Sequence, residues 1–215
     1  MQILRTLKER CDPTLACILV VDVQNDFCSS EGSCAKRGED VSAAQAMVPR
    51  LARLIAEARA VALPIVFIKT EHSEWTDTPP WLYRRSQQKK LKTCRQGTWG
   101  VEFYDGLSPL PNERVVIKHR YSAFINTDLN TVLKAKGVES VLVTGVATNV
   151  CVETTARDAY MYDYYVTLVE DCSAAYSAEM HKNTVKNISD HFGLVVPSPD
   201  IIALWKEPRS NKAVA

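Results

Sequence analysis

The 215-residue chain has almost no net charge, with 26 lysine and arginine residues against 25 aspartate and glutamate residues. Proteins that bind nucleic acids or anionic membranes carry a positive excess, so neither partner is indicated. Long apolar runs are also missing, because the stretch 16–23 falls far short of the roughly 20 residues that span a bilayer. The first residues place charges and a proline where a signal peptide needs an apolar core. We therefore expect a soluble, cytoplasmic protein without nucleic-acid or membrane partners.

Cysteine spacing does not fit a disulfide framework. The chain has seven cysteines, an odd number dispersed along the sequence, which favours a reduced cytosolic setting. Internal repeats, low-complexity tracts and domain linkers are also lacking. Because 46% of the residues are hydrophobic, a chain of this length buries a sizeable core. We expect one domain over residues 1–215, with its core at about 16–205.

Short apolar runs alternate with helical patterns along the chain. This alternation predicts βαβ units, and hence a three-layer, doubly wound α/β/α fold with a mainly parallel six-stranded sheet. The expected strands are 16–23, 64–70, 114–118, 140–146, 165–170 and 193–196. The expected helices are 41–60, 127–136, a helix following Cys151, 178–192 and 199–205.

The segment 71–113 breaks this alternation and is rich in proline, tryptophan and charge. Long ordered loops of this kind commonly act as lids, substrate walls or interfaces. Trp75, Trp81 and Trp99 are candidates for a pocket wall, although tryptophan more often serves in packing. The run 84–92 is expected to be a solvated helix face.

Three chemically useful residues follow expected strands. Asp22 interrupts an apolar run, where a carboxylate costs free energy unless it has a partner or a task. Lys118 ends the third strand, although a lysine there is commonly a surface charge. Cys151 follows the fourth strand near a helix N-terminus, which biases a thiol toward thiolate, although most cysteines are small buried hydrophobes. Ligands bind at the carboxyl ends of the strands in doubly wound sheets, so these residues are expected to share one edge.

The motifs Asp22-Val-Gln-Asn-Asp-Phe27 and Thr144-Gly-Val-Ala-Thr-Asn-Val-Cys151, with Lys118 between them, resemble the isochorismatase-like cysteine hydrolases. This family includes nicotinamidases and N-carbamoylsarcosine, ureidoacrylate and biuret hydrolases, and the resemblance covers roughly 16–196. Within the family, the runs 97–100, 118–124 and 146–155 are most similar to the ureidoacrylate amidohydrolases. The resemblance implies cleavage of the C–N bond in a small ureido or carbamoyl amide, such as ureidoacrylate, biuret, triuret or an N-carbamoyl compound.

The resemblance also implies a Cys-Asp-Lys triad. Asp22 would take the thiol proton of Cys151, and Lys118 would stabilise the charged forms of both. Backbone N–H groups of Ala147 and Cys151 would hold the oxyanion, and a cis peptide bond is expected between Val146 and Ala147. The thioester intermediate would be hydrolysed after release of ammonia or amine, without a cofactor.

By analogy with the family, Phe27, Trp99 and Tyr121 would wall the pocket, and Gln24 would hold the aspartate or fix the substrate. Core packing is the alternative for each side chain. Nicotinamidases place an aspartate and clustered histidines after the second strand to hold a metal, whereas this chain reads Lys69-Thr-Glu-His72, so no metal site is expected. Since the family forms dimers or tetramers, a homodimer or homotetramer is expected.

Other readings compete with this one. One alternative pairs Cys151 with His119 as a protease-like dyad, but strand alternation continued past Lys118 would point His119 to the opposite face. Hydrolysis of the vinyl ether of isochorismate would require no nucleophilic cysteine. A hydrolase of another small carboxamide, similar to maleamate or nicotinamide, and a non-catalytic thiol sensor remain alternatives. Loss of a triad member would mark the sensor, and here all three are present.

Overall fold

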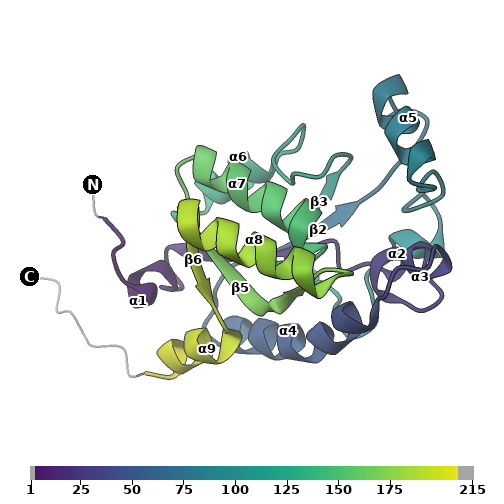
Figure 1. Ribbon diagram of the computed structural model, residues 1–215. Helices are drawn as coiled ribbons and strands as arrows, with labels where there is room; N and C mark the ends of the chain where they lie inside the picture. Colours follow the sequence, from purple (N-terminus) through teal and green to yellow (C-terminus); the bar gives the residue numbers. More distant parts are fainter. Residues whose placement is uncertain (1–2, 208–215) are drawn as a thin grey trace, which may run out of the picture.

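The computed structural model describes residues 3–207 and contains a six-stranded sheet in the order β3-β2-β1-β4-β5-β6 (Figure 1). All neighbouring strands are parallel, and each predicted strand is present. β5 continues to Ala174, beyond the predicted end at residue 170. The strands are β1 (Ala16–Val21), β2 (Ile65–Thr70), β3 (Arg114–Lys118), β4 (Ser140–Val146), β5 (Tyr165–Ala174) and β6 (Gly193–Val196). The predicted α/β fold is confirmed.

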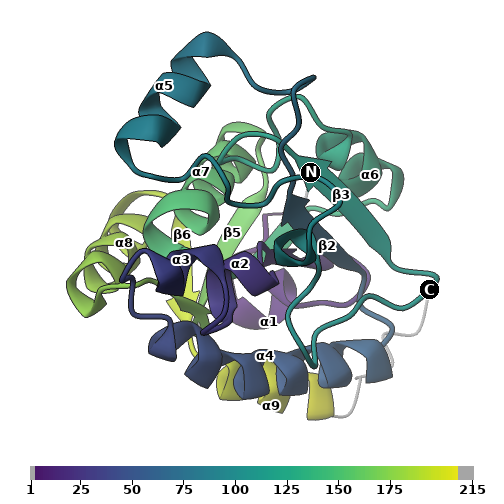
Figure 2. The same cartoon turned by 90° about the vertical axis from the view of Figure 1, so that its right-hand side faces the viewer.

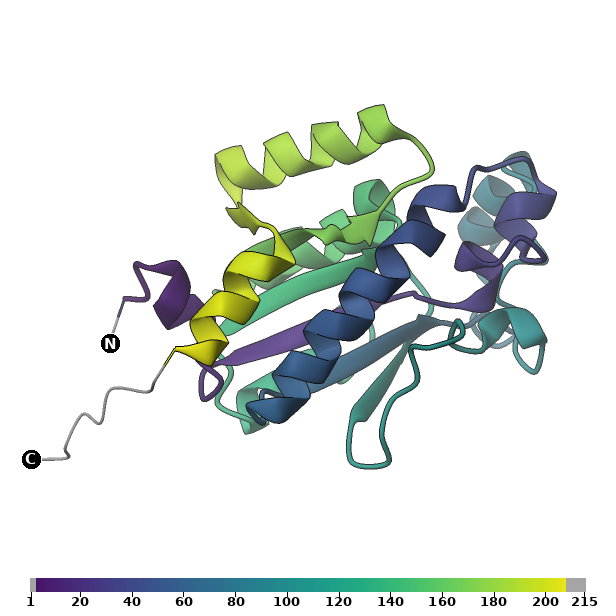
Figure 3. The same cartoon turned by 90° about the horizontal axis from the view of Figure 1, so that it is seen from below.

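Helices cover both faces of the sheet. α4 (Ser42–Ala60) and α9 (Ser198–Lys206) pack on one face, where Figure 3 shows them beside each other. The opposite face is covered by α6 (Leu129–Ala135), α7 (Glu153–Met161) and α8 (Ala178–His191). Within the described residues, every helix is too short or too polar to cross a bilayer.

β1 shows why the central strands are apolar throughout. Ile18 and Val20 pack into the α4 layer, whereas Leu19 and Val21 pack into the layer of α6 and α7. Successive side chains of a strand point to opposite faces, so a strand covered on both sides has no solvent-facing position. All six residues of β1 are accordingly buried.

β1 and β4 come close together at their carboxyl ends. Val21 is in register with Gly145, whose φ of 110° favours glycine. A Cβ atom on Gly145 would lie 2.0 Å from the carbonyl oxygen of Val21, so a side chain there would force the strands apart. The sheet order also changes direction between these two strands, which is where ligands bind in doubly wound folds. The chain therefore places the residues that follow β1 and β4 next to each other at this point.

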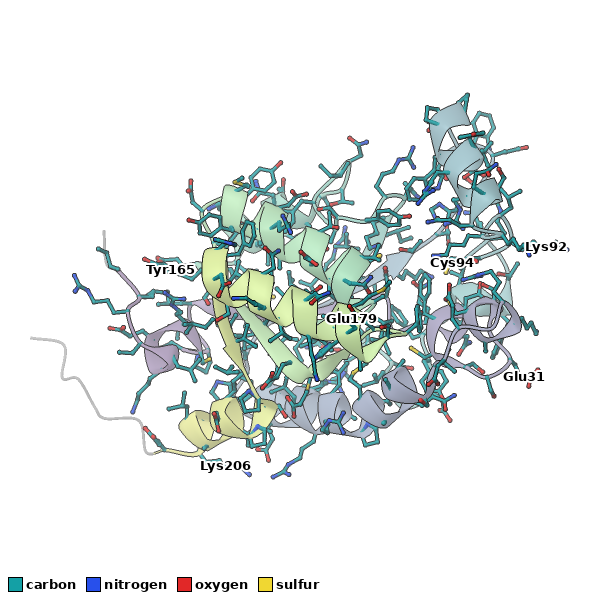
Figure 4. The ribbon with its side chains drawn as sticks, viewed as in Figure 1. Glu31, Lys92, Cys94, Tyr165, Glu179 and Lys206 are labelled. Atoms are coloured by element: carbon teal, nitrogen blue, oxygen red, sulfur yellow. The ribbon has the colours of Figure 1, made fainter. Side chains whose placement is uncertain are left out.

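The segment between β2 and β3 leaves the sheet. It contains α5 (Pro79–Gln87), which stands away from the helical layers in Figures 1 and 2, and the 3-10 turn η1 (Trp99–Val101). Part of the segment folds back on the short helices α2 (Asn25–Cys28) and α3 (Ser33–Lys36). Figure 4 accordingly shows Lys92 and Cys94 at the same end of the molecule as Glu31, opposite Tyr165 and Lys206.

The expectation of a solvated helix face over 84–92 is wrong at Arg85. This residue lies on α5 and is only 5% exposed. One nitrogen of its guanidinium, Nη2, donates to the carbonyl oxygens of Lys90 at 2.6 Å and Thr93 at 2.9 Å, because the chain turns back on α5 after Gln87. The turn that follows α5 therefore covers the guanidinium of Arg85.

Candidate active site

β1, β3 and β4 deliver Asp22, Lys118 and Cys151 to the same edge of the sheet. Lys118 Nζ lies 2.8 Å from Asp22 Oδ2, and both side chains are inaccessible to solvent. The Cys151 thiol is within hydrogen-bonding reach of both, and Cys151 is 7% exposed. The three residues predicted as a triad are thus brought together.

The backbone has unusual conformations near Asp22 and Cys151. Asp22 has a φ of 54°, a left-handed conformation that aspartate adopts more readily than most residues, so the chain turns sharply as it leaves β1. The peptide bond between Val146 and Ala147 is cis. Cys151 lies in a π-helical turn, η2 (Thr148–Val152), that runs directly into α7. Asp22 therefore follows β1 directly, and Cys151 lies in the turn that leads into α7.

Thr70 joins the charged pair and was not predicted. Because neighbouring strands lie about 4.8 Å apart, the ends of β3 and β1 are separated by roughly 10 Å, and Lys118 must reach across β2. Thr70 is the last residue of β2 and is in register with Lys118, so it lies between Lys118 and Asp22. Its Oγ1 accepts a hydrogen bond from Lys118 Nζ at 2.7 Å and donates to Asp22 Oδ1 at 3.0 Å. The position of Thr70 at a strand end was visible in the sequence, but the place of β2 between the other two strands was not.

Burial and neighbouring charges set the protonation of Lys118 and Cys151. Burial lowers the pKa of Lys118, but the charges of Asp22 and Cys151 outweigh it, so the net shift is upward and the lysine is charged. Burial raises the pKa of Cys151 to about 12, which the positive charge of Lys118 opposes and Asp22 reinforces. The helix terminus was expected to bias this thiol toward thiolate, but burial outweighs that effect. The thiol keeps its proton until a base removes it.

A cavity of about 400 Å³ opens beside Cys151, within the range of small-molecule sites. Phe27 and Tyr121, two of the predicted wall residues, line it, and so do Ala147 and Cys151. Trp81 on α5 contributes another wall, with its ring 5.1 Å from that of Tyr121 between centroids. The cavity is therefore bounded on one side by Cys151 and on another by the segment 71–113.

Trp99 does not line this cavity, contrary to the prediction. The main chain of η1 is tied to α2, since Asn25 Nδ2 donates to the carbonyl oxygen of Trp99 at 2.9 Å. This anchoring leaves the Trp99 side chain 54% exposed on a separate surface hollow that it shares with Arg37 and Leu91. Trp81, one of the three tryptophans considered from the sequence, takes the wall position instead.

Gln24 is buried, but it is not among the residues that line the cavity. Its Nε2 donates to the carbonyl oxygens of Thr70 at 2.9 Å and Val101 at 2.7 Å, and its Oε1 accepts from the Thr70 N–H at 2.8 Å. These hydrogen bonds tie the side chain to main chain, and among residues 3–207 it makes no hydrogen bond to the Asp22 side chain. Gln24 therefore fixes the end of β2, and with it Thr70.

The histidines have separate surroundings. His119 Nδ1 lies 2.7 Å from the carbonyl oxygen of Glu71, and His119 is not among the residues that line the cavity, so the Cys-His alternative lacks its geometry. His72 does line the cavity, with its ring 5.4 Å from that of Trp81. Over residues 3–207 there is no group of three or more His, Cys, Asp or Glu side chains arranged to hold a metal ion.

Similarity to known proteins covers nearly the whole described chain. The family described as "Isochorismatase domain" matches residues 16–200. Ureidoacrylate amidohydrolase RutB of Methylobacterium radiotolerans is 33% identical over 198 residues, covering 86% of this chain and 77% of that protein. A cysteine hydrolase from Pseudomonas syringae pv. phaseolicola has a TM-score of 0.82 at 27% identity, covering 96% of this chain and 98% of that one. N-carbamoylsarcosine amidase from Thermoplasma acidophilum has a TM-score of 0.70 at 25% identity, covering 91% and 99% respectively.

Proposed function

Because this chain belongs to the isochorismatase family, we propose that it is an amidohydrolase that uses Cys151 to cleave the C–N bond of a small ureido or carbamoyl amide. The observation that carries the proposal is the buried cluster of Asp22, Lys118 and Cys151 beside a cavity of suitable size. Relatives named for hydrolysis of ureidoacrylate and of N-carbamoylsarcosine support the substrate class.

The first step follows from the protonation states. Cys151 starts as a thiol, so Asp22 takes its proton as the sulfur attacks the carbonyl carbon. The negative charge moves from the carboxylate to the sulfur and then to the carbonyl oxygen. Lys118 is within reach of both side chains, so the charge on either one remains paired within the buried site.

The second half of the reaction returns the proton. Backbone N–H groups of Ala147 and Cys151 stabilise the tetrahedral oxyanion, and both residues line the cavity. Protonated Asp22 then gives its proton to the leaving nitrogen as the C–N bond breaks, which releases ammonia or an amine and leaves an acyl group on sulfur. Water, activated by the regenerated carboxylate of Asp22, hydrolyses this thioester and restores the thiol.

Ammonia release tests the proposal on ureidoacrylate, biuret, triuret and N-carbamoyl amino acids, with maleamate and nicotinamide as other carboxamides. We expect release from at least one ureido or carbamoyl compound, and a loss of about 10³-fold or more in Cys151→Ser because the nucleophile is removed. Cys172→Ala, a change at a buried thiol on β5 that is not among the residues lining the cavity, should keep the activity. Full activity in Cys151→Ser would contradict the covalent mechanism, and release from the carboxamides alone would contradict the substrate class.

A further inference from the structure

The cavity beside the nucleophile has an excess of positive charge. Arg85, Lys90 and Arg120 line it, whereas Glu39 is the sole carboxylate among its described lining residues. Glu39 is already paired, with Arg37 at 3.3 Å and Lys90 at 3.9 Å. In the described part of the chain, no carboxylate oxygen lies within 4.0 Å of the guanidinium of Arg85 or Arg120. Two arginines therefore face the cavity without a counterion.

Arg85 is the more deeply placed of the two. It is nearly fully buried, and burial lowers its pKa, which shows how poorly the surroundings solvate its charge. Carbonyl oxygens of Lys90 and Thr93 hold Nη2, whereas Nε and Nη1 have no acceptor among the described residues. Buried guanidinium groups are normally paired with an anion because an uncompensated charge costs several kcal/mol. Nε and Nη1 belong to the planar fork of guanidinium N–H donors, which suits a planar carboxylate.

Neutral polar atoms in the same cavity also lack partners. Both ring nitrogens of His72, Nε1 of Trp81 and Oε1 of Gln88 are buried without a hydrogen bond to any described residue. All three side chains line the cavity, and His72 is 1% exposed. Burial lowers the pKa of His72 to about 3, helped by the charge of Arg85, so its ring is neutral and offers one donor and one acceptor. Buried polar groups normally have hydrogen-bond partners, which indicates that a polar ligand supplies the partners of these atoms.

We propose that the substrate is a ureido or carbamoyl acid whose carboxylate is bound by Arg85, with Arg120 beside it and His72 hydrogen-bonded to the polar body of the molecule. The proposal rests on the amidohydrolase function above, since the carbamoyl end must reach Cys151. Both guanidinium groups lie against the ring of Trp81, at 5.6 Å for Arg85 and 4.8 Å for Arg120, which holds them at the cavity wall. A neutral ureide such as biuret would leave both charges unpaired.

A pair of ligands that differ in charge and not in shape tests the inference. Ureidoacrylate and its amide, ureidoacrylamide, should differ by about 10- to 100-fold in kcat/KM, in favour of the acid, because charge-assisted hydrogen bonds to a buried arginine are lost in the amide. Arg85→Met should abolish that preference, mainly through KM. Arg85→Lys should retain part of it, since lysine keeps the charge without the fork. Arg84→Met changes the exposed neighbour on the same helix and should behave as wild type.

Binding provides a readout that does not depend on turnover. Calorimetry on Cys151→Ser should give a lower Kd for the acid than for the amide, and Arg85→Met added to that background should make the two equal. Urea midpoints of each variant establish that it is folded. If Arg85→Met does not fold, Arg85→Lys takes its place and should weaken the preference for the acid. Equal binding of acid and amide, binding of neither, or a preference that survives in Arg85→Met would overturn the inference. Ammonia release from neutral ureides with no preference for acids would also overturn it while leaving the proposed function intact.

Discussion

Replacing Thr70 by valine removes one hydroxyl and keeps the shape of the side chain. That hydroxyl accepts from Lys118 Nζ at 2.7 Å and donates to Asp22 at 3.0 Å. The ammonium of Lys118 has three protons, and it has three oxygen acceptors: Thr70 Oγ1, Asp22 Oδ2 at 2.8 Å and the carbonyl oxygen of Arg120 at 3.1 Å. Valine leaves one buried N–H without its oxygen acceptor and removes one donor from the carboxylate.

Each hydrogen bond to a charged group contributes about 1.5–3 kcal/mol. Two such bonds are lost, but the direct contact between Lys118 and Asp22 remains, so we expect Thr70→Val to lower the free energy of unfolding by about 2–4 kcal/mol. The two charged groups also lose the hydroxyl that fixes their relative orientation. Since small misplacements at a reacting centre cost up to about 10²-fold, we expect kcat to fall by about 10- to 100-fold.

Urea unfolding and ammonia release measure the two effects, with Thr70→Ser as the matched control. Serine keeps the hydroxyl, so it should retain most of the activity and lose stability only through its missing methyl group. The reasoning would be refuted if Thr70→Val and Thr70→Ser had the same unfolding free energy and the same kcat. A loss of stability without a loss of kcat would show that Thr70 supports the fold and does not orient the triad.

Burial raises the pKa of five thiols from 9.0 to about 12, namely those of Cys11, Cys17, Cys34, Cys151 and Cys172. Their stabilising contribution is complete below pH 9 and is lost as pH rises toward 12, so the free energy of unfolding should fall as the pH rises above 9. Urea titrations between pH 8 and 10.5 would contradict this if they gave a constant value. Trp81→Ala should raise KM by about 10-fold because its ring lines the cavity, whereas Trp99→Ala should leave KM unchanged; equal effects in steady-state assays would argue against the wall assignment. Gly100→Ala should lower the free energy of unfolding by about 1–3 kcal/mol, because the new Cβ would lie 2.3 Å from the carboxyl carbon of Asp26. An unchanged urea midpoint in that variant would contradict the clash.

The sheet could be predicted because its signals are local. β1 is a continuous apolar run, and β-branched runs that alternate with helical patterns predict parallel strands. Parallel strands end at one edge of the sheet, so the polar residues at the ends of β1 and β3 and after β4 were expected at the same edge. Asp22, Lys118 and Cys151 were therefore predictable as residues of one edge, whereas their close contact depends on the strand order, which the sequence pattern does not show.

The cavity wall depends on long-range contacts that the sequence does not show. The segment 71–113 has no periodicity, so nothing in it distinguishes Trp81 from Trp99. Their positions depend on the return of the chain along α2 and α3, where Asp26 Oδ2 accepts from the N–H of Cys94, 68 residues away, at 2.6 Å. The direction in which the pKa of the Cys151 thiol shifts could not be predicted for a related reason. A helix terminus can be recognised locally, but the burial that outweighs it at Cys151 depends on the whole fold.

β3, which supplies Lys118, is an edge strand whose ladder partner in the described sheet is β2. Because β3 has a neighbour on one side, a single row of backbone hydrogen bonds holds it in the described sheet. The side chain of Ile117, next to the lysine, is 43% exposed. Strands of this kind open locally at lower free energy than the centre of a sheet. A transient opening of β3 would withdraw the ammonium while the core remains folded, and amide exchange in 114–118 reports its frequency. On heating, loss of function would then follow the fraying of one strand, at a temperature below the melting of the molecule.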